Sequence, residues 1–264
     1  MTFIDWLFEI GNFENPYKAG QWGLLHILTL VLIVSTVVGS YFLVKYSKDK
    51  EKTARTIILV LAITLTFLEF SQRFVYIIRR FYYNVPDMEG LTLFWILIPK
   101  PWCAVACWTV IAAAFIKKKF LYNFASLQGL ICTIIYFAYP GTGFNNEYIM
   151  FSNLYSISTH AILMTMSILF IVLKFTKFEY KNIWKELVCF VVAFGYGFLQ
   201  IFVFKTFADP MYFMPGGDIQ GILGVDYGVY LALYIVFLVI YINIYYLISD
   251  FKTVKSLFVK KQVE

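Results

Sequence analysis

The sequence carries little charge for its length. Only 14% of its 264 residues are Asp, Glu, Lys or Arg, whereas 61% are hydrophobic. A soluble domain carries about 25% charged residues, and a water-soluble sphere of this size cannot hide so much apolar surface. The shortage of charge therefore excludes an ordinary soluble enzyme and predicts an integral membrane protein of the all-α class.

Several familiar signals are missing as well. The cysteines Cys103, Cys107, Cys132 and Cys189 lie in apolar runs rather than in loops, which argues against a disulfide framework. The N-terminus lacks the basic start and cleavage site of a secretory signal peptide. The net charge of +6 is not gathered into one face or arm, so we expect no nucleic-acid partner. We also expect no cofactor and no metal, because two His and one Cys on three helices do not define a tetrahedral site.

The apolar runs predict a polytopic helical protein that forms one membrane domain over residues 1–264. Runs of about 20 apolar residues must be helical in a bilayer, where unpaired backbone groups are too costly. Seven such runs lie near residues 22–45, 55–78, 92–116, 120–139, 148–174, 183–205 and 225–248. Pro99 and Pro101 interrupt the third, so we expect its outer half to be kinked or unwound. The sequence also predicts a tight turn over 140–146 and a structured, lid-like loop over 208–226.

The distribution of Lys and Arg predicts the orientation. The first, third and fifth connections and the C-terminal tail are rich in lysine, whereas the opposite side holds only Lys18, Arg79, Arg80 and Lys205. Because short cytoplasmic loops carry the positive excess, we expect the N-terminus outside and the C-terminus inside. The predicted location is the cell membrane, crossed several times.

Polar residues inside the spans mark the candidate site. They are rare in a bilayer unless they line a site or a water-filled cavity. Both histidines fall there, and at 1.5 Å of rise per residue the whole set falls in one depth band below the outer surface. The set comprises His26, Glu69, Arg73, Lys100, Cys103, His160 and Gln200.

Each of these residues also has a purely structural interpretation. Glu69 and Arg73 are spaced i, i+4 and can pair along one helix face. Lys100 can extend toward the outer headgroups, and Gln200 can join helices through hydrogen bonds. Histidines are often packed and hydrogen-bonded, and a free cysteine such as Cys103 often behaves as a small buried hydrophobe.

The chemical interpretation of Cys103 with a histidine is nucleophilic acyl transfer. A thiol attacks an ester carbonyl well only as the thiolate, so it needs an imidazole to take its proton and later return it. His160 is the expected general base, and His26 the expected orienting group or oxyanion donor.

Four segments carry a resemblance to a known family. They are IPKPWCAVACW around Cys103, the PGTGFNN turn followed by FSNLYSISTHAILM around His160, GQWGLLHILTL around His26, and DPMYFMP with GVDYGVYL. Over residues 20–248 the chain resembles the YwaF family of bacterial integral membrane proteins. That family is similar to an animal transmembrane acyltransferase of ether phospholipids, for which a Cys nucleophile and a His have been proposed. The chain departs from the pattern at Pro101, where many relatives have a His.

The leading hypothesis is therefore a membrane acyltransferase or transacylase that acts on phospholipid or lysophospholipid, with membrane lipids as its partners. Cys103 would form a thioester, His160 and His26 would assist, and Arg73 or Lys100 would hold a lipid phosphate. The alternative is a transporter or binding protein that uses Glu69, Arg73 and the same pocket without covalent chemistry. A third possibility is a noncatalytic membrane scaffold. The sequence leaves the lipid or solute and the oligomeric state open.

Overall fold

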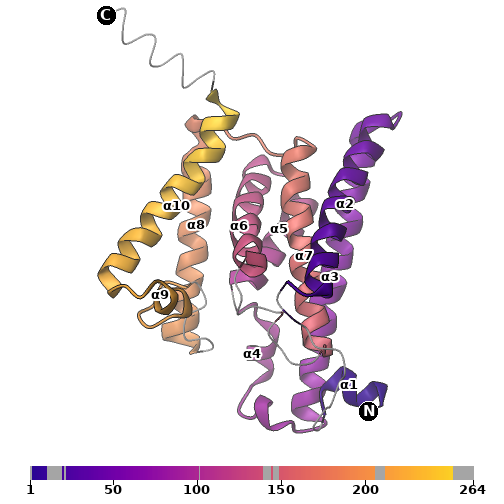
Figure 1. Cartoon of the computed structure of the whole chain (residues 1–264), viewed down its shortest axis with the longest axis vertical. Helices are drawn as coiled ribbons and strands as arrows, with labels where there is room; N and C mark the ends of the chain where they lie inside the picture. Colours follow the sequence, from indigo (N-terminus) through magenta and orange to yellow (C-terminus); the bar gives the residue numbers. More distant parts are fainter. Residues whose placement is uncertain are drawn as a thin grey trace, which may run out of the picture.

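The computed structural model describes residues 2–10, 20, 22–100, 102–138, 144, 149–205 and 212–251, except for the side chains of Asp87 and Asp218. Across these residues every regular element is a helix, as Figure 1 shows. The all-α prediction is confirmed.

Six helical segments are long and apolar enough to cross a membrane. They are α2 (Leu24–Tyr46), α3 (Lys50–Phe81), α6 (Lys119–Ala138), α7 (Phe151–Val172), the run Tyr180–Phe204, and α10 (Tyr227–Ser249). The run Tyr180–Phe204 comprises the short helix η2 (Tyr180–Asn182), α8 (Ile183–Phe198) and the π-helical turn η3 (Leu199–Phe204). The chain is thus a multi-pass membrane protein.

The third predicted span is broken, as Pro99 led us to expect. A short helix, α4 (Leu93–Leu97), is followed by Ile98 in an extended conformation, and α5 (Trp102–Ile116) begins after the break. Pro101 itself lies outside the described residues. Because α5 has only 15 residues, the count of seven crossings and their orientation stay predictions.

Short elements close the end of the bundle that carries the N-terminus. They are α1 (Phe3–Phe8), η1 (Pro86–Met88) and α9 (Asp218–Leu223), shown at the lower end of Figure 1. Glu9, just after α1, accepts hydrogen bonds from the Arg79 guanidinium (2.7 Å) and from the Ser152 amide (2.9 Å), which joins α1 to α3 and α7. The predicted turn at 140–146, apart from Phe144, and residues 208–211 of the predicted lid-like loop lie outside the described residues. The basic tail after residue 251 also lies outside them.

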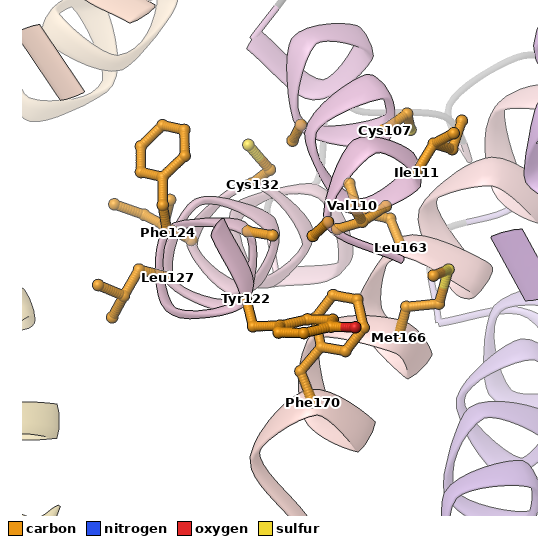
Figure 2. Close-up of a cluster of buried hydrophobic side chains, with 14 of the residues drawn as sticks. Cys107, Val110, Ile111, Tyr122, Phe124, Leu127, Cys132, Leu163, Met166 and Phe170 are labelled. Atoms are coloured by element: carbon orange, nitrogen blue, oxygen red, sulfur yellow. The ribbon is translucent and has the colours of Figure 1, made fainter. Parts of the chain in front are cut away.

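The protein core lies among α5, α6 and α7. Figure 2 shows side chains of the three helices packed together, including Val110 and Ile111 of α5, Leu127 of α6 and Phe170 of α7. In its most apolar stretch α6 is 78% buried, whereas α10 is only 11% buried. The helix α6 is therefore the centre of the bundle, and α10 lies at its periphery with a large lipid-facing surface.

The contact of α6 with α7 depends on a glycine. A Cβ atom on Gly129 would lie 2.1 Å from Ser167 Oγ and 3.1 Å from Leu163 Cδ1. Helices in membranes approach closely where small residues face each other, because there is little hydrophobic force to drive their association. Gly129 therefore sets the spacing of the two central helices.

We expect Gly129→Val to lower the stability of the purified protein by about 1 to 3 kcal/mol, the usual cost of overpacking. The melting temperature in detergent measures this loss. Gly195→Val on α8 is the matched control, since a Cβ at Gly195 meets nothing within 4 Å, and its melting temperature should stay close to that of the parent. Equal losses in the two variants would contradict this account of the α6–α7 contact.

Candidate functional site

The candidate site begins where the broken third element resumes as a helix. Cys103 is the second residue of α5, and its half-buried side chain interacts with the thiol of Cys132 on α6 and with the imidazole of His160 on α7. Three central helices thus bring a thiol and an imidazole together. Of the candidates named from sequence, Cys103 and His160 are the pair that the structure places side by side.

The His160 ring is held in one orientation. Its Nδ1 lies 2.7 Å from the Ser156 carbonyl oxygen. Because a carbonyl only accepts hydrogen bonds, Nδ1 carries a proton, and the neutral ring has an unprotonated Nε2. The Tyr136 ring stacks on the imidazole with 3.6 Å between ring centroids and 10° between ring planes, and its hydroxyl lies 3.0 Å from Ser156 Oγ. The neutral imidazole therefore has a base nitrogen available while its other nitrogen and its face are fixed.

The first turn of α5 adds a further electrostatic effect at Cys103. Backbone N–H groups in the first turn of a helix have no partner within the helix and carry partial positive charge. A negative charge that develops on Sγ is stabilised at this position.

An apolar cavity of about 620 Å³ opens beside Cys103. Its walls come from the start of α5 and the second half of α6 on one side and from α9 and α10 on the other, and Cys132 and Tyr136 also line it. The facing wall is largely apolar and includes Ile219, Ile222, Leu233 and Phe237. This volume lies within the range of about 300 to 1,000 Å³ typical of small-molecule sites. The cavity is suited to hold a hydrocarbon chain with its reactive end against the thiol.

The predicted pairing of Glu69 with Arg73 is present and buried. The Arg73 guanidinium lies 2.7 Å from the Glu69 carboxylate, and their side chains are 7% and 1% exposed. Glu69 also accepts a hydrogen bond from the Tyr155 hydroxyl at 2.7 Å. The remaining donors of Arg73 go to backbone carbonyls, to Glu69 O at 2.7 Å and to Leu97 O at 3.0 Å. The Nε and Nη1 donors of Arg73 are thus engaged inside the protein, and Arg73 does not line the cavity.

Gln200 has a similar structural role on the other side of the break. It lies in the π-helical turn η3, and its Nε2 donates to the Pro99 carbonyl at 2.9 Å. The Tyr196 hydroxyl donates to the same oxygen at 2.8 Å. Arg73, Tyr196 and Gln200 therefore satisfy two carbonyls, those of Leu97 and Pro99, at the break between α4 and α5. Irregular backbone is tolerated at membrane depth only where protein groups complete it in this way.

Lys100, another candidate, and Cys107 lie close to Cys103 in the sequence. Lys100 is half-buried, with Nζ 5.7 Å from the Trp95 ring centroid. Cys107, one turn after Cys103, interacts with Glu69 and with Cys103.

His26 is placed apart from the thiol. It is 1% exposed, and its Nδ1 accepts a hydrogen bond from the Trp22 amide at 3.1 Å. Its ring stacks on Phe144 with 4.2 Å between centroids, and Phe137 lies 6.0 Å away. Its Nε2–H interacts with the Phe137 backbone but falls outside hydrogen-bond geometry. Tyr136, which precedes Phe137 in the sequence, stacks on His160. His26 is therefore connected to His160 through aromatic rings and not through a direct contact.

The seven candidate residues therefore do not share one polar chamber. None of Glu69, Arg73, Lys100, Gln200 or the two histidines lines the apolar cavity beside Cys103. The physical reason is that Glu69 and Arg73 pair with each other, while Arg73 and Gln200 donate hydrogen bonds to backbone carbonyls of the broken element.

Sequence reasoning missed Cys132, Tyr136 and Ser156. A sequence signal existed only for Ser156, which precedes His160 by one helical turn and so offers its carbonyl to the imidazole. Nothing local in the sequence relates α6 to Cys103. Among the described residues no three His, Cys, Asp or Glu side chains gather so as to hold a metal ion.

Comparisons of the chain with models of known families, with curated proteins and with solved structures find no match.

The buried pair gives a prediction about stability. We expect Arg73→Met to lower the unfolding free energy by about 3 to 5 kcal/mol, because it leaves the Glu69 carboxylate buried without its partner. Glu69→Gln together with Arg73→Met should recover part of the loss, but not the part due to the Leu97 carbonyl. Thermal unfolding in detergent measures both changes.

Arg55→Met is the matched control for this prediction. Arg55 pairs with Glu51 at the same i, i+4 spacing, but the two side chains are 43% and 77% exposed, and exposed pairs contribute about 0 to 1 kcal/mol. If Arg73→Met were as mild as Arg55→Met, the structural role assigned to Arg73 would be wrong.

Proposed function

We propose that the protein is a membrane-embedded acyltransferase or transacylase that acts on phospholipid or lysophospholipid. Cys103 is the nucleophile and His160 the general base. The observation that supports this most directly is that the Cys103 thiol, which lines an apolar cavity of about 620 Å³, also interacts with the His160 imidazole. A scaffold has no need for a thiol, an oriented imidazole and a chain-sized cavity in one place.

In the first half-reaction the His160 Nε2 takes the proton from Cys103 Sγ, which attacks the ester carbonyl carbon of a phospholipid. The carbon–sulfur bond forms, the ester carbon–oxygen bond breaks, and the imidazolium returns its proton to the departing glycerol oxygen. The products are a lysophospholipid and an acyl thioester on Cys103. The start of α5 stabilises the negative charge that Sγ carries before attack.

In the second half-reaction an acceptor hydroxyl, on a lysophospholipid or another lipid, takes the place of the departed one. His160 Nε2 removes the hydroxyl proton as the oxygen attacks the thioester carbon. The carbon–sulfur bond breaks, the new ester forms, and the proton moves from the imidazolium to the Cys103 thiolate. In this kind of covalent catalysis one imidazole commonly acts as the general base in one step and as the general acid in the next.

The acyl chain and the headgroup have separate places in this proposal. The chain occupies the cavity between α6 and α10, where Leu233 and Phe237 face Ile131 and Ile135. Lys100 lies three residues before Cys103 and holds the lipid phosphate, since the charge of Arg73 is already paired with Glu69. His26 acts as a positioning residue through Phe137 and Phe144 and takes no part in proton transfer.

The resemblance to the YwaF family points to the same chemistry, because that family is similar to an ether-phospholipid acyltransferase. The cysteine and the two histidines that carry the resemblance are Cys103, His26 and His160. We propose the cell membrane as the location and membrane lipids as the partners.

The covalent intermediate gives the most specific test of this function. Purified protein mixed with a phospholipid that carries a labelled acyl chain should acquire the label on Cys103, as read by peptide mass spectrometry. Cys103→Ala should abolish both labelling and transfer. Cys189→Ala is the control, since Cys189 is half-buried on α8 and outside the cavity. Full transfer activity in Cys103→Ala would overturn the mechanism.

The two histidines are expected to differ in their effects. His160→Gln should slow transfer by about 100-fold to 10,000-fold, the usual contribution of a general base. His26→Phe should keep the rate within about tenfold, because the stacking with Phe144 is retained and no proton transfer is lost. Single-turnover kinetics measure both rates, with melting temperatures confirming that each variant is folded. Equal losses would mean that His160 has no special role.

A second candidate function is transport or binding of a small lipidic solute. The observation that favours it is the broken α4–α5 element beside a cavity, an arrangement that transporters use for their binding sites. Flux or binding that survives Cys103→Ala but fails when Leu233 and Phe237 are replaced by Trp would support transport over acyl transfer.

A further inference from the structure

The end of the bundle opposite α1 and α4 contains a groove that the proposed function does not use. Two adjoining hollows of about 570 and 530 Å³ share the residues Glu51, Arg55, Lys117, Tyr122 and Phe175. They lie where the connection of α2 to α3, the connection of α5 to α6 and the end of α7 meet, at the upper end of Figure 1. We call the two hollows together the basic groove.

The basic groove carries a strong excess of positive charge. Seven basic and two acidic side chains line it. The basic ones come from segments far apart in the sequence, such as Lys50, Lys117 and Lys174. Among the described residues none of these three lysines makes an ion pair. Of the seven basic side chains, Arg55 is the one that forms an ion pair within the described part of the chain, with Glu51 at 2.8 Å.

Two of these lysines occupy a strained backbone conformation. Lys117 and Lys174 follow the ends of α5 and α7 with φ of +61° and +62°. Glycine is the usual residue at such a position, because a side chain there is disfavoured. In this chain both positions are lysines, and both side chains line the same groove.

The walls of the basic groove have a second, apolar component. Ile58, Leu59 and Phe115 line one hollow, and Val172 and Leu173 line the other. A site with positive charge at its rim and apolar side chains beneath matches a lipid, in which a charged headgroup is joined to hydrocarbon. Basic pockets between transmembrane helices on the cytoplasmic side are known to suit anionic headgroups.

We propose that the basic groove binds the phosphate group of an anionic lipid headgroup. The site is separate from the acyl-transfer site, because Cys103 and Lys117 are separated by 14 residues of α5 and its end, which is roughly 20 Å of helix. The chemistry that recognises the headgroup is charge pairing and hydrogen bonding from lysine ammonium groups to phosphate oxygens. A free phosphate ion has the same chemistry, and the experiment separates the two sources.

The test compares two triple variants of the full chain in phosphatidylcholine nanodiscs. The groove variant is Lys50→Gln/Lys117→Gln/Lys174→Gln. The matched control is Lys48→Gln/Lys118→Gln/Lys181→Gln, whose lysines lie in the connections that follow α2, α5 and α7 but outside both hollows. The two variants lose equal charge, so a general attraction of the basic end for anionic lipid affects them equally. Native mass spectrometry then measures binding of added phosphatidylglycerol, and a parallel titration uses inorganic phosphate.

We expect the parent and the control to bind phosphatidylglycerol saturably and the groove variant to bind at least about tenfold more weakly, since each lysine near an anionic surface contributes to attraction. The triple Lys→Arg variant should retain binding, which shows that a loss in the groove variant is not misfolding. Equal weakening in groove and control variants, or no saturable binding by the parent, would overturn the proposal. If inorganic phosphate binds saturably and prevents phosphatidylglycerol from binding, the groove is a phosphate site whose ligand is a soluble ion and not a lipid.

Discussion

The structure around Cys103 depends on the hydrogen bonds that satisfy the broken backbone between α4 and α5 inside the membrane. An unpaired carbonyl in hydrocarbon costs several kcal/mol, so a break at this depth survives only if other groups satisfy it. Arg73 donates to the Leu97 carbonyl, and Tyr196 and Gln200 donate to the Pro99 carbonyl. Glu69 and Tyr155 in turn hold Arg73. A network that spans α3, α7 and α8 thus fixes where α5 begins.

The position of Cys103 follows from that start point. Because α5 begins at Trp102, the thiol lies in the first helical turn, facing Cys132 and His160 of the two most central helices. The Ser156 carbonyl and the Tyr136 ring fix the imidazole in one orientation. On the other side, α9 and α10 leave an apolar cavity against the same thiol. The bundle interior thus orders the pairing of thiol and imidazole, and the cavity on the other side of the thiol is apolar.

The sequence alone predicted the fold class, the break at Pro99 and seven spans, six of which contain the long apolar helices, because these features depend on hydropathy and on the chemistry of proline. It also predicted the pairing of Glu69 with Arg73, which needs only helical spacing. It did not predict which way each helix faces. The helix α2 is apolar nearly all round, so nothing in its pattern directed His26 toward Phe144 rather than toward Cys103. Contacts across helices, such as Gln200 with Pro99 and Glu9 with Arg79, depend on the packed bundle and left no local signal.

The central claim is that Cys103 is an activated thiol open to a hydrocarbon chain, whereas Cys132, Cys107 and Cys189 are not activated. The most direct measurement is the alkylation rate of each cysteine in liposomes at neutral pH, using an iodoacetamide that carries a long acyl chain and peptide mass spectrometry as the readout. The account predicts that Cys103 reacts first and that excess phospholipid with matching chains slows it. Reaction of Cys189 or Cys132 as fast as that of Cys103 would contradict the account.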